Sequence, residues 1–213
     1  MAKTRKPSND ELTVEEFRDR QVAQLPTQNG TYALCDLDEV PIYVGVTEEG
    51  LRKRVQRHLT SARSDVIANR LLDVWEVAYV WAWPEPRKDR MLQLEAHFYN
   101  KFHRQSSLVN VAVLKDPGDI GDVPDPIRVV VLPEEQILLR RRAEIRLPRQ
   151  AKTFLDLVAH ILEVKNNRET LFGLQTHFAR LEKYTKEFLK PDLTTNPPSP
   201  KHVVGTKGVA PVD

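Results

Sequence analysis

The fold is decided by a stretch near the N-terminal end, Gly30-Thr31-Tyr32-Ala33-Leu34-Cys35, followed after a short gap by Val40-Pro41-Ile42-Tyr43-Val44-Gly45. Each run is short, rich in apolar and β-branched residues, and bounded by Gly, Pro or Asp, which is typical of a β-strand. The intervening segment, Asp36–Glu39, has the residue types that favour a turn. The sequence therefore predicts a β-hairpin over residues 30–45.

Helices and one further strand are predicted around this hairpin. A helix is expected from Glu15 to Leu25, because Thr13 and Glu16 have the spacing of a capping box. Residues 75–83 place three tryptophans and a tyrosine at alternate positions, which predicts a central strand with one aromatic face. The other predicted elements are helices over 51–59, 65–74 and 89–103 and a short extended segment over 108–114.

Beyond residue 114 the pattern becomes helical. Residues 115–126 are rich in Pro, Gly and Asp and are predicted to form a linker, and residues 127–132 are a candidate strand. Apolar residues then recur at three- and four-residue steps, which predicts helices over 134–147, 151–164 and 169–189. The last residues, 191–213, contain few large apolar side chains and are predicted to be disordered.

The predicted fold class is α/β, a small and mainly antiparallel sheet flanked by helices, with a C-terminal α-helical region. The domain organisation follows from the changes of pattern. We expect an N-terminal arm and helix (1–28), a small α/β domain (29–115), a linker with a candidate strand (116–132), an α-helical accessory region (133–190) and a disordered tail (191–213).

The composition limits the class of protein. The chain has 213 residues, of which 40% are hydrophobic and 29% charged, as in soluble globular proteins. The formal net charge is only +2, so any phosphate-binding surface must come from local clustering. A single cysteine, Cys35, excludes an internal disulfide and a cysteine-rich zinc site. No apolar stretch has the length of a membrane span, and we expect a cytoplasmic protein without a membrane partner.

Polar residues recur along the small domain in an order that suggests a catalytic site. Singly, each is weak evidence, because a strand tyrosine usually packs and a helical glutamate usually faces solvent. Arg54 and His58, four residues apart, share a helix face that in most proteins is simply solvated. In chain order the residues are Tyr32 within G-x-Y, Tyr43 within Y-x-G, Arg54, His58, Glu95 and Asn110.

This order resembles the GIY-YIG nuclease family, with Thr31 and Val44 at the two isoleucine positions. The resemblance extends from Gly30 to Val111. The stretch Leu51–His58 resembles the basic helix of the family. Leu94-Glu95-Ala96 matches its glutamate, and Leu108-Val109-Asn110 matches its asparagine segment. Val46 departs from the pattern, because the family often has a polar residue directly after Y-x-G.

The resemblance implies a role for each matched residue. Tyr32 is implied as the base-like residue, and Tyr43 and His58 as residues that position water and phosphate. Asn110 is implied to hold the site together. Arg52 and Arg57 compete with Arg54 for the arginine role, and we prefer Arg54 because it directly precedes the apolar Val55. The implied catalytic set is Tyr32, Tyr43, Arg54, His58, Glu95 and Asn110.

The residue types also suit phosphodiester hydrolysis on chemical grounds. Glu95 offers an oxygen ligand to a hard cation, Mg²⁺ or Mn²⁺, which needs only one or two protein carboxylates. Arg54 can place a planar, permanently charged fork on phosphoryl oxygens. A tyrosine phenol with an ordinary pKa near 10 needs cationic neighbours before it can act as a base.

Two basic groups are candidates for DNA contact. The first is Arg52, Lys53 and Arg57 on the basic helix, and the second is Arg140, Arg141 and Arg142. The second group is equally well interpreted as an exposed helix face balanced by nearby glutamates. The later helices have a continuous apolar stripe, so they either pack on each other as a hairpin or form the surface of a homodimer.

The sequence thus predicts a metal-dependent endonuclease that hydrolyses DNA phosphodiester bonds. Restriction or defence, mobile-element and repair roles all remain open. Two alternatives also remain, a non-catalytic nucleic-acid-binding or protein-interaction module that retains the fold, and a nuclease directed at RNA.

Overall fold

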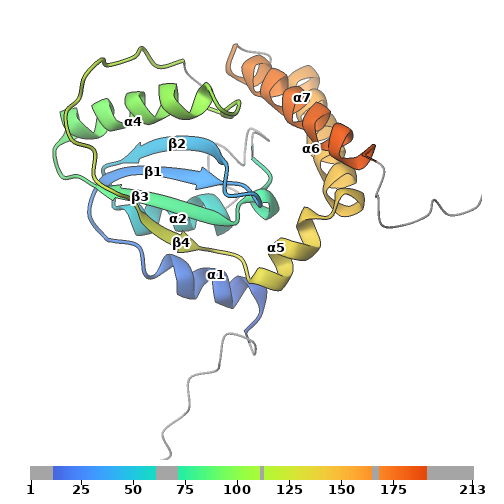
Figure 1. The fold of residues 1–213 in the computed structure, drawn as a ribbon, viewed down its shortest axis with the longest axis horizontal. Coiled ribbons are helices and arrows are strands. Elements are labelled where there is room, and N and C mark those ends of the chain that lie inside the picture. Colours follow the sequence, from blue (N-terminus) through green and yellow to red (C-terminus); the bar gives the residue numbers. More distant parts are fainter. Residues whose placement is uncertain (1–11, 61–71, 111–112, 165–167, 191–213) are drawn as a thin grey trace, which may run out of the picture.

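A four-stranded antiparallel sheet with helices on both faces forms the centre of the computed structural model (Figure 1). The structure describes residues 12–60, 72–110, 113–164 and 168–190. Helices α1 (Val14–Val22) and α2 (Leu51–Thr60) cover one face, and α4 (Lys88–His103) covers the other. The strand order is β2-β1-β3-β4, with β1 (Gly30–Cys35), β2 (Pro41–Thr47), β3 (Tyr79–Pro84) and β4 (Ile127–Val130). The predicted α/β fold class is confirmed.

The predicted hairpin is confirmed as β1 and β2. One carboxylate oxygen of Asp36 accepts hydrogen bonds from the backbone N–H groups of Asp38 and Val40, at 2.9 and 3.0 Å, which closes the turn. In the antiparallel register Tyr32 lies opposite Gly45. Because alternate residues share a face of a strand, Tyr43 points to the same side as Gly45 and Tyr32. The hairpin therefore brings both tyrosines to the face covered by α2.

The helices pack on the two faces through separate apolar clusters. On the α1 and α2 face, Leu34 and Val80 of the sheet pack with Val55 of α2. On the other face, Trp83 of β3 stacks on Phe98 of α4 with ring centroids 3.9 Å apart. The predicted helix at 15–25 is confirmed as α1, with both hydrogen bonds of its capping box, and the helix at 89–103 is confirmed as α4.

The predicted strand over 75–83 was wrong at its start. Residues Val74–Glu76 form a short 3-10 helix, η2, and β3 begins only at Tyr79. The ring of Trp75 lies between the guanidinium groups of Arg18 and Arg140, at 4.8 and 4.3 Å from its centroid. These tertiary contacts outweigh the alternating aromatic pattern, which fits only Tyr79, Trp81 and Trp83.

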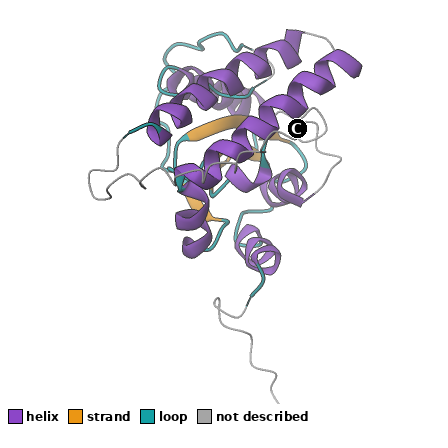
Figure 2. Ribbon diagram, turned by 90° about the vertical axis from the view of Figure 1, so that its right-hand side faces the viewer, coloured by secondary structure: helices purple, strands orange, loops and turns teal. Residues whose placement is uncertain are grey.

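Three C-terminal helices follow β4, namely α5 (Glu134–Arg141), α6 (Ala143–Glu163) and α7 (Arg168–Phe188). Helices α6 and α7 run side by side next to one end of the sheet (Figures 1 and 2). The predicted interruption between the helices at 134–147 and 151–164 was wrong. The helical structure is interrupted at Arg142 instead, and α6 continues through Pro148. Pro148 is the sixth residue of α6, beyond the first turn where proline is tolerated best. Arg146, Arg149 and Gln150 around it bind carboxylates of the sheet domain, and these contacts hold the helix in place.

A buried network of charges joins the C-terminal helices to the sheet. Arg146 is 1% exposed; its Nε donates to Glu76 at 2.8 Å and its Nη1 to Asp38 at 2.5 Å. Arg180 of α7 pairs with Asp36 at 3.2 Å. Such groups are stable inside a protein only when each charge keeps its partner. The C-terminal helices are therefore attached to the turn of the hairpin and to η2.

The predicted linker over 115–126 lies against α4. Trp83 Nε1 donates to the carbonyl of Pro124 at 3.0 Å, and Arg90 of α4 donates to the carbonyls of Ile120 and Asp122. The following strand β4 pairs with β3, so the sheet includes residues beyond 115. The domain division given above stays a prediction.

Some predictions lie outside the described residues, namely the tail at 191–213 and most of the helix at 65–74. Among the helices that the structure describes, none is both long and apolar enough to cross a membrane.

Candidate active site

A buried tyrosine–histidine pair lies between the sheet and α2. The hydroxyl of Tyr32, on β1, lies 2.6 Å from Nε2 of His58, on α2. Both side chains are fully buried. Burial raises the pKa of Tyr32 well above its usual value, so the phenol is neutral at physiological pH. Whether the phenol donates or accepts is set by the tautomer of the imidazole.

Gly45 makes room for the two tyrosines. A Cβ atom at this position would lie 2.8 Å from the hydroxyl of Tyr32 and 2.9 Å from a ring carbon of Tyr43. The ring centroid of Tyr43 lies 6.0 Å from the ring centroid of Tyr32 and 5.6 Å from that of His58. A glycine opposite the first tyrosine is therefore a steric requirement of the three-ring cluster.

Arg54 connects this cluster with the surface. Its Nε donates to the hydroxyl of Tyr32 at 3.4 Å, and its side chain is 19% exposed. The arginine lies one turn before His58 on α2, so both side chains reach the same phenol. Burial raises the pKa of Tyr32 and of the half-buried Tyr43, and the positive charge of Arg54 opposes that rise. It is the one permanent cation in contact with Tyr32 among the described residues.

Glu95 lies on α4, which packs beside β2 and β1 on the other face of the sheet. Helix α4 is fixed to β1 one turn earlier, where the Thr31 hydroxyl donates to the carbonyl of Met91 at 3.1 Å. Burial raises the pKa of Glu95 to about 7. Burial raises the pKa of Tyr43, and the negative charge of Glu95 adds to that rise.

Glu95 fits a divalent cation of the Mg²⁺ type. Within the described ranges, no cation pairs with its carboxylate, and no group of three or more His, Cys, Asp or Glu forms a metal cage. Mg²⁺ keeps several waters and binds through one or two carboxylates, so a single half-buried and uncompensated glutamate suits it. A closed site of the zinc type does not fit these residues.

Asn110 holds the outer edge of β2. Its Oδ1 accepts from the Val44 N–H at 3.0 Å, and its Nδ2 donates to the Val44 carbonyl at 2.6 Å. The N–H of Val109 donates to the carbonyl of Ile42 at 2.8 Å. Both contacts flank Tyr43 in the chain. Asn110 is therefore placed to position the strand that carries Tyr43, and it touches backbone rather than the ring cluster.

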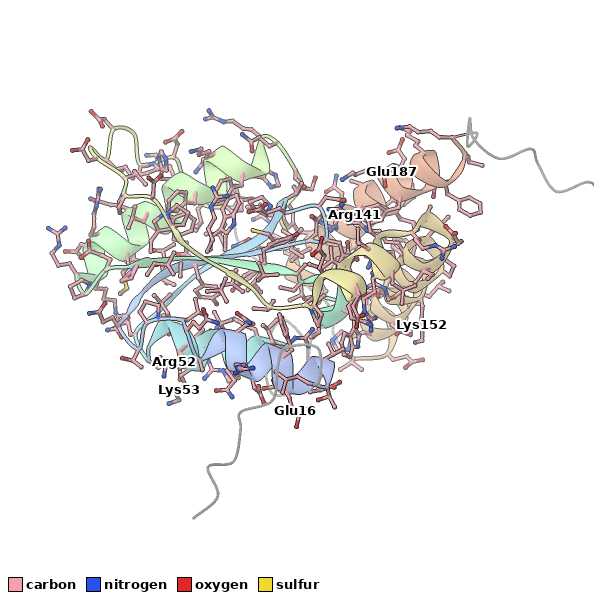
Figure 3. All side chains as sticks on the ribbon, turned by 60° about the horizontal axis from the view of Figure 1, so that its bottom comes forward. Glu16, Arg52, Lys53, Arg141, Lys152 and Glu187 are labelled. Atoms are coloured by element: carbon pink, nitrogen blue, oxygen red, sulfur yellow. The ribbon has the colours of Figure 1, made fainter. Side chains whose placement is uncertain are left out.

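The predicted DNA-contact residues lie in two separate places. Arg52 and Lys53 lie on α2, and Arg141 lies far from them near α6 (Figure 3). Lys53 is 72% exposed, whereas Arg52 donates to the carbonyl of Leu25 at 3.0 Å. The second group is engaged within the chain: Arg140 lies over Trp75, Arg141 pairs with Asp38, and Arg142 pairs with Glu144. Contact of either group with DNA stays a prediction.

One residue near the site was not found from the sequence. Glu49 pairs with Lys53, Arg54 and Arg57. The spacing of 49, 53 and 57 places an acid and two bases at four-residue steps, and this pattern would have identified the contact. The carboxylates that bind Arg146 were also missed, because they lie 70 or more residues away in the chain.

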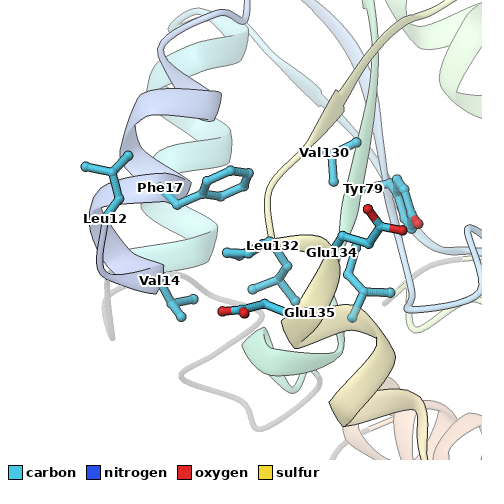
Figure 4. A pocket seen from close by; sticks show the side chains of 10 residues that line it. Leu12, Val14, Phe17, Tyr79, Val130, Leu132, Glu134 and Glu135 are labelled. Atoms are coloured by element: carbon cyan, nitrogen blue, oxygen red, sulfur yellow. The ribbon is translucent and has the colours of Figure 1, made fainter. Parts of the chain in front are cut away.

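A second candidate for a binding site is an apolar pocket elsewhere on the molecule. It lies between α1, β4 and α5 and is lined by apolar side chains with Glu134 and Glu135 at its rim (Figure 4). It contains none of the expected catalytic residues, and two carboxylates repel a phosphate. The ring cluster with Arg54 and Glu95 is therefore the better candidate for phosphodiester chemistry.

The fold and this cluster together define a nuclease-type α/β domain. Residues 28–107, less than half of the chain, match the family model described as the GIY-YIG catalytic domain. Domains of this type are generally found in endonucleases, and this segment of the chain is similar to them. The matched range contains Tyr32, Tyr43, Arg54, His58 and Glu95, and Asn110 follows it closely. A comparison with curated proteins gave no match.

Proposed function

We propose that the protein is an endonuclease that hydrolyses DNA phosphodiester bonds with the help of Mg²⁺ or Mn²⁺. The observation that carries the proposal is the buried Tyr32–His58 pair, in contact with Arg54 and next to a half-buried Glu95 whose pKa is raised to about 7. Perturbed ionisable groups of this kind cluster at catalytic sites. A module that only binds nucleic acid has no chemical need for this arrangement.

The residues divide the reaction between them. Tyr32 takes the proton of the attacking water, and His58 Nε2, 2.6 Å from the phenol oxygen, holds the phenolic proton during this step. The guanidinium of Arg54 binds non-bridging phosphoryl oxygens and stabilises the charge that develops on them. Tyr43 orients the water and the phosphate. Asn110 keeps β2, and with it Tyr43, in place.

Glu95 would hold the cation. A divalent cation bound there would supply positive charge to the phosphate and to the leaving oxygen. Metal binding requires the ionised carboxylate, so cation affinity should rise as the pH passes through about 7.

A plasmid-cleavage assay with Mg²⁺ or Mn²⁺ tests this function. The wild type should cut, and Glu95→Ala should lose at least about a hundredfold in rate, because one carboxylate contributes the whole protein ligand set. Asp89→Ala is the matched control, since it removes an exposed carboxylate from the same helix. Unchanged metal-dependent cutting by Glu95→Ala would refute the metal assignment. A wild type that binds DNA and RNA but cuts neither would favour the non-catalytic module.

We also propose a homodimer through the C-terminal helices, which a restriction-type role would require, because two strands cut together need two active sites; a repair or nicking role needs only one. Helices α6 and α7 expose Leu155, Leu162 and Phe178 to 65%, 78% and 59%. Exposed charged residues of these helices pair with each other within one helix, as in Lys152–Asp156 and Lys186–Glu182. Because these charges cancel, the apolar surface suits contact with a second copy of the chain better than contact with phosphate. Light scattering should show a dimer, and Leu162→Glu should yield a monomer; a monomeric wild type at all concentrations contradicts the proposal.

A further inference from the structure

Glu49, just before α2, faces three cations of that helix. Its carboxylate lies 3.5 Å from Lys53 Nζ and 3.7 Å from Arg54 Nη1, and it also pairs with Arg57 Nη2. The Glu49 side chain is 32% exposed, and those of Arg54 and Arg57 are 19% and 30% exposed. These partly buried pairs are less screened by solvent than pairs on an open surface.

The backbone fixes Glu49 in this position. Its N–H donates to the hydroxyl of Thr47 at 3.1 Å. The next residue, Gly50, has φ +96°, and a Cβ there would lie 2.5 Å from the carbonyl oxygen of Thr27. Only glycine suits this turn. The short connection between β2 and α2 therefore holds the Glu49 carboxylate in front of the basic face of α2.

A simpler interpretation is that Glu49 stabilises the N-terminus of α2 through the helix dipole. The adjacent Glu48 has the same charge and nearly the same distance from the helix start, yet it turns away and pairs with Lys88 at 2.7 Å. A dipole effect also gives no reason for a carboxylate to reach Arg57, two turns along the helix. The contact is with the arginine side chains themselves.

We propose that Glu49 occupies the place of a substrate phosphate on Arg54 and Arg57 in the free protein and leaves it when nucleic acid binds. Carboxylate and phosphate oxygens engage a guanidinium with the same geometry. Arg54 contacts Glu49 and the Tyr32 hydroxyl at once, so a phosphate that replaces Glu49 lies next to the ring cluster. The proposal rests on the proposed function for the identity of the phosphate, a nucleic-acid backbone.

This exchange makes Glu49 a residue that limits affinity. Binding of a phosphate must first break the contacts of Glu49 and then leave its negative charge close to the substrate. Removal of that charge should tighten binding and should release more counterions per DNA bound. Stray anions and non-substrate phosphates face the same competition, so Glu49 lowers the affinity of the two arginines for anions in general.

The test is the affinity for a short labelled DNA duplex in EDTA, where no cleavage occurs, measured by fluorescence anisotropy at several salt concentrations. Glu49→Gln should bind about three- to tenfold tighter than the wild type and show a steeper salt dependence. Glu48→Gln is the matched control and should stay within about twofold, because it makes the same charge change at the neighbouring position. Combination with Arg57→Gln should remove most of the gain.

Glu49→Asp separates the exchange from a dipole effect. It keeps the charge beside the helix start but shortens the reach to Arg57, so its binding should also be tighter than that of the wild type. Binding by Glu49→Gln and Glu49→Asp that equals or falls below the wild type overturns the proposal, and so does an equal gain in Glu48→Gln. Thermal unfolding of each variant shows whether a weakened binder is simply misfolded.

The outcomes separate this inference from the nuclease function. If the wild type cuts plasmid with Mg²⁺ but Glu49→Gln binds no tighter, the nuclease function stands and the phosphate exchange fails. If the wild type does not cut, yet Glu49→Gln binds duplex more tightly, the exchange stands and the nuclease function fails. A protein that binds no duplex in any form overturns both.

Discussion

At the scale of single residues, the site combines groups that are costly to bury. The Tyr32–His58 pair is fully buried and satisfied by its own hydrogen bond, whereas Glu95 is half-buried and has no cationic partner among the described residues. A protein accepts such a cost where function requires it. The unbalanced carboxylate is therefore the residue whose properties should respond most to pH and to metal.

We expect Glu95→Gln to stabilise the metal-free protein at high pH only. Burial raises the pKa of Glu95 from 4.5 to about 7, so the folded protein holds this proton more tightly than the unfolded chain does. The cost of the charged form is absent below pH 4.5, grows as the pH rises to 7, and is complete above it. The variant should gain about 1–2 kcal/mol near pH 8 after allowance for partial exposure, and nothing near pH 4.

Urea unfolding in EDTA at the two pH values measures this effect. Added Mg²⁺ should then stabilise the wild type and leave the variant unchanged, because binding to the folded state shifts the unfolding equilibrium. Asp89→Asn is the control, because it removes an exposed carboxylate from the same helix. An equal gain at both pH values would mean that the charge of Glu95 is not the cause.

At the scale of elements, β2 depends on a contact from outside the sheet. It is an edge strand, and an edge leaves backbone groups without partners. Asn110 satisfies both backbone groups of Val44, and Val109 adds one bond to Ile42. Val109 and Asn110 therefore provide the hydrogen bonds that a further strand would make at this edge of the sheet. The position of Tyr43 therefore depends on residues more than sixty positions later in the chain.

We expect Asn110→Ala to loosen β2 without unfolding the domain. Loss of two buried hydrogen bonds to Val44 should cost about 1–3 kcal/mol of stability. Hydrogen exchange at the Val44 amide should become faster, and kcat should fall more than KM rises, because Tyr43 loses its fixed position. Asn100→Ala is the matched control, since Asn100 also makes two backbone hydrogen bonds, but on α4. Unchanged exchange at Val44 would contradict this role.

Local elements were predictable where local contacts decide them. The Thr13–Glu16 capping box and the Asp36 turn both involve residues close in the chain, and each is present. The start of β3 and the break before α6 were not predictable, because they depend on contacts of Trp75 with Arg140 and of Arg146 with Glu76. Such tertiary contacts outweigh the local preference of a segment for strand or helix.

The candidate site was predictable to a similar extent. The resemblance identified the residue types, and the structure adds what spacing does not reveal, the Tyr32–His58 hydrogen bond and the space that Gly45 leaves. Side-chain contacts between different elements depend on register and packing, which a sequence pattern does not specify. Glu49 is the exception, because its four-residue spacing to Lys53 and Arg57 is visible in the sequence.

At the scale of the whole molecule, the C-terminal helices and the sheet domain share one buried set of charges. Arg146 and Arg180 come from α6 and α7, and Asp36 and Glu76 come from the sheet side. Tyr184 also donates to Glu76 at 3.2 Å. Removal of one arginine leaves carboxylates buried without compensation, which is the costly way to break such a network. The two parts should therefore unfold together.

We expect Arg146→Ala to lower the free energy of unfolding by about 3–5 kcal/mol. Arg142→Ala is the matched control, because Arg142 pairs with Glu144 on the surface and its loss should change stability by less than about 0.5 kcal/mol. Urea unfolding followed by circular dichroism and by tryptophan fluorescence measures both. Equal effects of the two variants would show that the buried charges do not stabilise the molecule.

The charge network also sets an order of events while the protein is being made. Asp36 leaves the ribosome 144 residues before Arg180, which neutralises it. At about 5–20 residues per second this interval lasts roughly 7–30 s. Arg146 follows Asp36 after 110 residues, so for most of that interval Asp36 has neither arginine to neutralise it. The turn of the hairpin therefore gains its full set of charge partners only once α7 has been made.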